Sequence, residues 1–139
     1  MRISKLLYQD FPSVISVIRH LGSINKVNSR GINFKLVSDN WITKYRTRTF
    51  DRKEPETLDW IDENVRDDDI LFDVGANIGI YSIYAAFRNP KITVYAFEPE
   101  YSNLNQLKQN ILNNSLQSRV VPFSIALGDN TGISYLHIQ

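Results

Sequence analysis

The chain has no cysteine among its 139 residues. This absence excludes disulfide bonds, thiolate nucleophiles and cysteine-ligated metals, and it fits a reducing compartment. The sequence also lacks an uninterrupted apolar run of the roughly 18 residues that a membrane span needs, and its N-terminus lacks the apolar core of a secretory signal. We therefore expect a cytoplasmic protein without a transmembrane segment.

Net charge is also small, at +1, but the two signs are unevenly distributed. Residues 1–50 carry nine Lys and Arg against two Asp and Glu, whereas residues 51–139 carry seven against thirteen. Such an asymmetry indicates either that the basic lead packs on the acidic remainder or that it meets an anionic partner. The hydrophobic content of 42% is ordinary for a globular protein, so we expect one folded core.

The first third of the chain predicts a helix-and-hairpin lead, residues 1–53. Its expected elements are helices over 3–8 and 12–21 and paired strands over 32–37 and 41–50. The second helix is amphipathic, which suits docking on its own domain or lying on a membrane surface. In the second strand, the two-residue period places Lys44, Arg46 and Arg48 on one face. This basic stripe is either a charged, solvent-facing strand edge that resists pairing with another strand, or a site that binds a phosphate or carboxylate. Three aligned cations are too few to indicate a nucleic-acid-binding surface.

From residue 54 to residue 139 the pattern alternates between helices and strands. The expected order is helix 55–65, strand 70–74, helix 80–87, strand 92–97, helix 103–113 and strand 119–126. Right-handed crossovers place the three strands in the order 3-2-1 within a parallel sheet. Pro122 supports an edge position for the third strand, because proline cannot donate to a ladder. Residues 133–138 alternate weakly and predict an antiparallel return or a flap.

A small-residue turn follows the first of these strands. Asp73 lies near the carboxyl end of that strand, where open α/β sheets bind ligands. Gly75, Asn77 and Gly79 follow it in the pattern D-x-G-x-N-x-G, and both residue types, glycine and asparagine, tolerate positive φ. Glu98 stands at the end of the next strand. Its separation from Asp73 in the sequence is close to that at which dinucleotide-binding folds place an acid that binds the ribose. The structural alternatives are a plain strand-to-helix turn and, for Glu98, a helix-terminal acid.

Three stretches together resemble the FkbM type of S-adenosylmethionine-dependent methyltransferase. They are residues 73–79 (DVGANIG), 95–99 (YAFEP) and 126–129 (ALGD). The resemblance extends roughly from Glu54 to Gly132. It implies an α/β fold, half of a Rossmann-like class I methyltransferase, with S-adenosylmethionine as cofactor.

The resemblance also implies roles for individual residues. Gly75, Asn77 and Gly79 would form the floor beneath the methionyl tail, and Asp73 would bear on the ammonium of that tail. Glu98 would accept from the ribose hydroxyls. Backbone near Ala126 would meet the adenine. We name no catalytic residue and no metal site, and the expected acceptor is an oxygen of a sugar, a lipid or a small metabolite.

Further strands that complete this family's fold have no counterpart in the 139 residues. We therefore expect the N-terminal part of a larger methyltransferase or a truncated product with impaired activity. The free edge of strand 70–74 would then favour self-association. Two other functions stay open: an NAD-dependent oxidoreductase, disfavoured by Asn77 in place of a glycine, and a non-catalytic module whose basic lead recruits an anionic partner.

Overall fold

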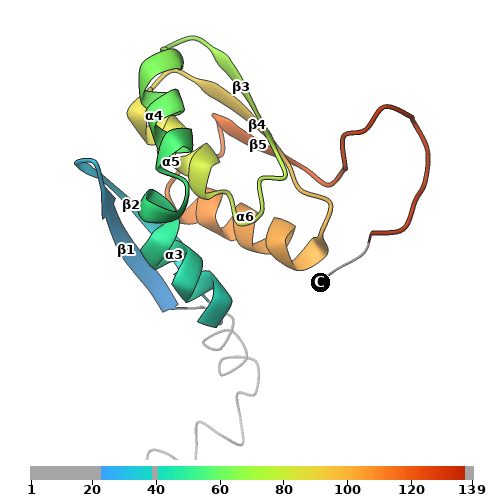
Figure 1. Cartoon of the computed structure of the whole chain (residues 1–139), viewed down its shortest axis with the longest axis horizontal. Coiled ribbons are helices and arrows are strands. Elements are labelled where there is room, and N and C mark those ends of the chain that lie inside the picture. Colours follow the sequence, from blue (N-terminus) through green and yellow to red (C-terminus); the bar gives the residue numbers. More distant parts are fainter. Residues whose placement is uncertain (1–22, 39–40, 137–139) are drawn as a thin grey trace, which may run out of the picture.

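The computed structural model describes residues 23–38 and 41–136 (Figure 1). Its elements are β1 (Ser23–Ser29), β2 (Ile32–Ser38), α3 (Trp41–Lys53), α4 (Pro55–Asn64), β3 (Ile70–Val74), α5 (Ile80–Arg88), β4 (Thr93–Phe97), α6 (Tyr101–Asn113) and β5 (Val120–Phe123). The two helices expected before residue 22 lie outside the described residues. Within the described ranges, no helix is both long enough and apolar enough to cross a bilayer.

A hairpin is present, but it is not the predicted one: the strand expected over residues 32–37 pairs with a strand that precedes it and not with residues 41–50. β1 pairs antiparallel with β2, from Ser23 opposite Ser38 to Ser29 opposite Ile32. The turn residues Arg30 and Gly31 have φ values of 50° and 79°. Positive φ at both central residues is the geometry of a tight hairpin turn that matches the twist of its strands.

The prediction of a strand over residues 41–50 is wrong, because this segment belongs to helix α3. Alternating threonines suggested a strand, yet two of them satisfy their hydroxyls within the helix. Thr47 donates to the carbonyl of Thr43 at 2.7 Å, and Thr49 donates to that of Tyr45 at 2.8 Å. Thr43, Thr47 and Phe50 form the buried face at helical spacing.

The change from strand to helix also divides the predicted basic stripe. Residues four apart lie on one side of a helix, whereas residues two apart lie on nearly opposite sides. Lys44 and Arg48 line one surface hollow together, and Arg46 lines a different pocket. The three cations therefore do not form one surface.

The three-stranded sheet has the order β3-β4-β5, and both pairs are parallel. The predicted order 3-2-1 is confirmed, with Pro122 on the edge strand β5. The third strand is shorter than predicted and ends at Phe123, level with the end of β4. Residues 124–136 form no helix or strand, so the return strand expected from residue 133 is absent as far as the described chain reaches.

Helices α5 and α6 cover one face of this sheet, and the hairpin packs on their outer side (Figure 1). One hydrophobic cluster joins Phe34 and Leu36 of β2 to residues such as Ile83 and Leu107 of the helices. Arg30 of the hairpin turn pairs with two acids of α4, at 2.7 Å from Asp59 and 2.9 Å from Asp62. The basic lead therefore packs on the acidic part of the chain at this point.

The free edge of β2 is paired by side-chain amides of α6. Asn110 accepts from the N–H of Val37 at 2.7 Å, and Asn114 accepts from the N–H of Lys35 at 2.8 Å. Gln106 donates to the carbonyl of Val37, and Asn114 donates to that of Lys35. Asn110 also donates to the carbonyl of Ile78 at 2.8 Å, so one buried amide joins the hairpin to the loop after β3.

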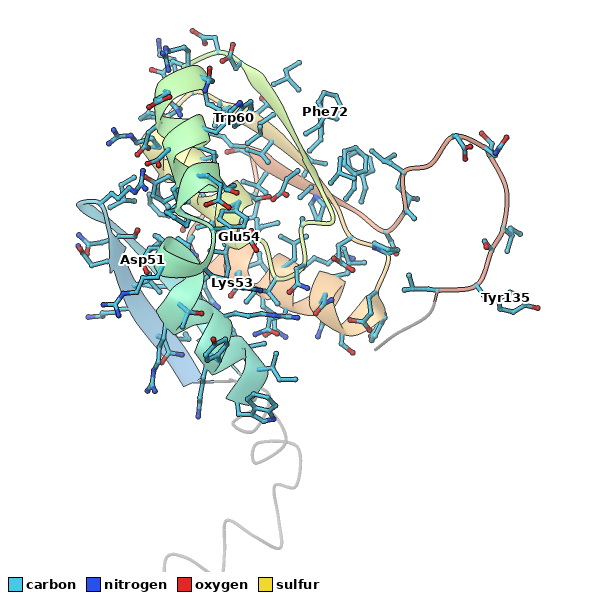
Figure 2. All side chains as sticks on the ribbon, viewed as in Figure 1. Asp51, Lys53, Glu54, Trp60, Phe72 and Tyr135 are labelled. Atoms are coloured by element: carbon cyan, nitrogen blue, oxygen red, sulfur yellow. The ribbon has the colours of Figure 1, made fainter. Side chains whose placement is uncertain are left out.

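The other face of the sheet, here called the open face, is apolar and exposed in the described structure. Ile70, Phe72 and Val74 are each 59% exposed, whereas Leu71 and Asp73, on the other side of the strand, are partly buried. Figure 2 shows Phe72 on the side away from the helices. Neighbouring rings on this face have centroids 5.1 to 5.9 Å apart, and they belong to Phe72, Tyr95, Phe97 and Phe123.

Candidate functional site

The loop between β3 and α5 contains three left-handed residues, as its residue types predict. Gly75, Asn77 and Gly79 have φ values of 77°, 51° and 81°. At Gly79 a Cβ atom would lie 2.2 Å from Cδ1 of Leu107, so both conformation and packing require glycine there. At Gly75 a Cβ atom would meet nothing within 4 Å, so this side of the loop is open.

Hydrogen bonds tie this loop to the end of β4. The N–H groups of Gly75 and Ala76 both donate to the carbonyl of Phe97 at 2.9 Å. The N–H of Asn77 donates to Oε2 of Glu98 at 2.7 Å. The loop is therefore held at the carboxyl ends of two adjacent strands, where α/β sheets place their ligands.

Glu98 is buried, at 5% exposure, and both of its oxygens are bonded. Oε1 accepts from the N–H of Glu100 at 2.8 Å, while Oε2 accepts from Asn77. The cap of α6 is Glu100, which accepts from the N–H groups of Ser102 and Asn103 at 2.9 and 2.7 Å. Because each carboxylate oxygen carries two lone pairs, Glu98 retains an acceptor site on each oxygen. Such a pair of sites matches the two hydroxyls of a ribose.

Asp73 lies at the adjacent strand end and on the same face as Glu98. It pairs in register with Ala96, and side chains two residues apart share a face. Its Oδ2 accepts from Oγ of Ser82 at 2.5 Å. Burial raises the pKa of Asp73 and the nearby charge of Glu98 raises it further, whereas hydrogen bonds from Ser82 oppose the shift. A cation beside Asp73 would stabilise its charged form.

A pocket of about 220 Å³ adjoins the loop on the side of α3. Arg46 lines it, and its Nη1 donates to Oδ1 of Asn77 at 2.7 Å. Tyr81 also lines the pocket and donates from its hydroxyl to Oε2 of Glu54 at 2.9 Å. Burial and the hydrogen bond to Glu54 raise the pKa of Tyr81. Figure 2 shows Glu54 and Lys53 at the junction of α3 and α4.

The strand prediction missed this pocket, since it placed Arg46 with Lys44 and Arg48. Only a helical period in residues 41–53 would have separated Arg46 from them. Contacts of Glu54 with Tyr81 join residues 27 positions apart, and no sequence spacing indicates them.

The structure brings together five of the six predicted site residues: Asp73, Gly75, Asn77, Gly79 and Glu98. Ala126 lies elsewhere, exposed and three residues beyond the end of β5. With Pro99 it lines a separate concavity of about 740 Å³. Both histidines of the chain, at positions 20 and 137, lie outside the described residues.

Solved structures with similar folds include a protein in complex with AdoMet and a SAM-dependent methyltransferase. The M. jannaschii TYW2 structure, described as a complex with AdoMet, aligns with a TM-score of 0.52 at 23% identity over 73% of this chain and 42% of that one. The SAM-dependent methyltransferase from Agrobacterium tumefaciens aligns with a TM-score of 0.51 at 12% identity, over 75% and 33%. The chain therefore has the Rossmann-like fold of this class of protein.

Comparison with known sequences indicates which type of methyltransferase the chain resembles. The chain is 36% identical over 69 residues to the 31-O-demethyl-FK506 methyltransferase FkbM of Streptomyces tacrolimicus, covering 50% of this chain and 26% of that protein. It is 31% identical over 81 residues to the hexuronic acid methyltransferase AglP of Haloferax volcanii, covering 58% and 32%. The predicted resemblance to FkbM-type methyltransferases is thus confirmed, and the chain spans about a quarter to a third of these relatives. No family model matches it.

Proposed function

We propose that this chain binds S-adenosylmethionine at the loop after β3 and takes part in methyl transfer. One observation carries the proposal: Asp73 and Glu98 lie on one face at adjacent strand ends, with the left-handed loop bonded to Glu98. The cofactor has a ribose at one end of its sulfonium and an amino acid tail at the other. A buried acid with free lone pairs and a second acid that favours a nearby cation fit those two parts.

Individual roles follow from these positions. Glu98 accepts from the ribose hydroxyls, and Asp73 lies toward the ammonium of the tail. Gly75 presents backbone without a side chain, so a ligand can approach the loop closely. Contact between the adenine and backbone near Ala126 is supported by the family resemblance alone.

The bound cofactor supplies an electrophilic methyl group, and the protein contributes mainly orientation. Holding an acceptor near attack distance accounts for much of the rate in such displacements. We assign no side chain a catalytic role. The acceptor is proposed to be an oxygen of a sugar, a lipid or a small metabolite, since the names of the two relatives refer to a 31-O-demethyl compound and a hexuronic acid.

Calorimetry with the 139-residue chain tests the cofactor. We expect S-adenosylhomocysteine, the product form of the cofactor, to bind and NAD to show no binding. Glu98→Gln should weaken binding by at least about tenfold, because an amide offers fewer acceptor sites to a diol. Glu63→Gln, the same change at an exposed acid of α4 outside the candidate site, is the matched control. Thermal unfolding checks that both variants fold.

Two results would contradict the proposal. Binding of NAD without S-adenosylhomocysteine would favour the oxidoreductase, although Asn77 stands where dinucleotide folds use glycine. Binding of neither ligand by the folded wild-type chain would favour a non-catalytic module.

A further inference from the structure

Arg46 in the pocket beside the loop has no acidic partner among the described residues. Its described hydrogen bond is the one to Oδ1 of Asn77, and no carboxylate of residues 23–38 or 41–136 forms an ion pair with it. Glu54, the acid that lines the same pocket, accepts from the hydroxyl of Tyr81 and lies 4.0 Å from Nζ of Lys53. This partly buried guanidinium therefore has N–H donors with which to bind an anion from outside the described chain.

Asn77 joins this arginine to the candidate cofactor site. Its backbone N–H donates to Glu98, and its side-chain oxygen accepts from Arg46. Glu98, the acid assigned to the ribose, and Arg46 thus contact the same residue. Glu98 and Arg46 therefore lie at the two ends of a short chain of hydrogen bonds through Asn77.

The pocket has the size of one chemical group at the end of a ligand and not of a whole ligand. At about 220 Å³ it is smaller than the roughly 300–1,000 Å³ of sites that enclose a whole small molecule. Its charged lining residues are Arg46, Lys53 and Glu54, and Lys53 pairs with Glu54, so Arg46 supplies the excess positive charge. A carboxylate is the planar anion that a guanidinium recognises with two parallel hydrogen bonds.

We propose that Arg46 binds the carboxylate at the end of the methionyl tail and so selects ligands with an intact amino acid end. This inference rests on the proposed function. It gives the basic lead a defined role, because helix α3 supplies a residue of the cofactor site. Besides the packing of Arg30 on acids of α4, the basic lead would then also meet an anionic partner, the cofactor's own carboxylate.

Two ligands that differ only in the tail separate this role from a structural one. Calorimetry would measure the binding of S-adenosylhomocysteine and of 5′-methylthioadenosine, which lacks the amino acid end, to the wild-type chain and to Arg46→Gln. We expect Arg46→Gln to weaken the binding of S-adenosylhomocysteine roughly ten- to hundredfold, because this is the range for lost hydrogen bonds to a charged group. Affinity for 5′-methylthioadenosine should stay within about twofold.

Arg48→Gln is the matched control, since Arg48 is exposed on the same helix and lines a different hollow. It should change neither affinity. Arg46→Lys should recover part of the affinity for S-adenosylhomocysteine, because it keeps the charge without the bidentate geometry.

Each alternative outcome is decisive. Equal affinities of Arg46→Gln and the wild type for S-adenosylhomocysteine would overturn this inference and leave the proposed function intact. Equal losses for both ligands would also overturn it, because Arg46 would then act only through the loop. Absence of binding of either ligand to the wild type would overturn the proposed function and this inference together.

Discussion

Asp73 carries a charge that its surroundings disfavour. Burial is the main cause of its raised pKa, and Glu98 adds to it. Because the folded-state pKa lies above the unfolded value, the folded state binds the proton more tightly. Stability therefore falls as pH rises from the unfolded pKa through the folded one. A charge kept at some cost to stability at the end of a strand is typical of a ligand site.

Replacing Asp73 by asparagine should therefore separate stability from binding. Asparagine can still accept from Ser82, so we expect Asp73→Asn to unfold at the same or a higher temperature than the wild type at pH 7. The difference should shrink toward pH 4, where the wild-type carboxyl gains its proton. Circular dichroism at the two pH values measures this, and calorimetry should show weaker binding of S-adenosylhomocysteine. A marked loss of stability at pH 7 would mean that the charge itself holds the fold.

Residue types alone predicted much of the loop. Two glycines and an asparagine indicated left-handed backbone, and the structure confirms it at all three positions. Besides its positive φ, Gly79 is also required by its contact with Leu107 of α6, which no local pattern encodes. The same limit applies to Arg46, whose partner Asn77 lies 31 positions away.

Helices and strands whose apolar residues repeat at a clear spacing were predicted well, whereas elements composed mainly of polar residues were not. The helix predicted over 55–65 is observed as α4, and the apolar residues Leu58, Ile61 and Val65, at helical spacing, are buried. Helix α3 has few apolar residues on its buried face, so its threonines favoured a strand. β1 is largely polar, and the strand pattern therefore missed it.

Helix α6 acts as a hydrogen-bonding partner for β2, and this arrangement can be tested at Asn110. Its side chain is fully buried and satisfies the N–H of Val37 and the carbonyl of Ile78. Asn110→Ala leaves both backbone groups without a partner, so we expect the free energy of unfolding to fall by at least about 2 kcal/mol. Urea unfolding measures the change. Asn105→Ala, exposed on the same helix, should change it by less than about 0.5 kcal/mol. Similar values for the two variants would contradict the role given to α6.

The whole molecule buries its sheet from one side only within the described residues. Alternating helices and strands predicted the order β3-β4-β5 and the free edge of β3. The apolar run in β3 is typical of a buried strand, yet three of its five residues are exposed. What covers a sheet face depends on segments distant in sequence, so a local pattern indicates the need for a cover and not its source.

The apolar open face should bind a hydrophobic dye. Phe72 is the residue of this face to replace, because its side chain is exposed and its removal should cost little stability. Phe72 is 59% exposed and contacts Tyr95 and Phe97, so Phe72→Ser should lower stability by less than about 2 kcal/mol, below the 3–5 kcal/mol of a buried phenylalanine. We expect it to reduce the fluorescence of bound anilinonaphthalene sulfonate. Tyr101→Ser, at a position 79% exposed on α6, should leave the fluorescence unchanged. If the dye does not bind the wild type, the face is covered in solution, and sedimentation at rising protein concentration would show whether self-association covers it.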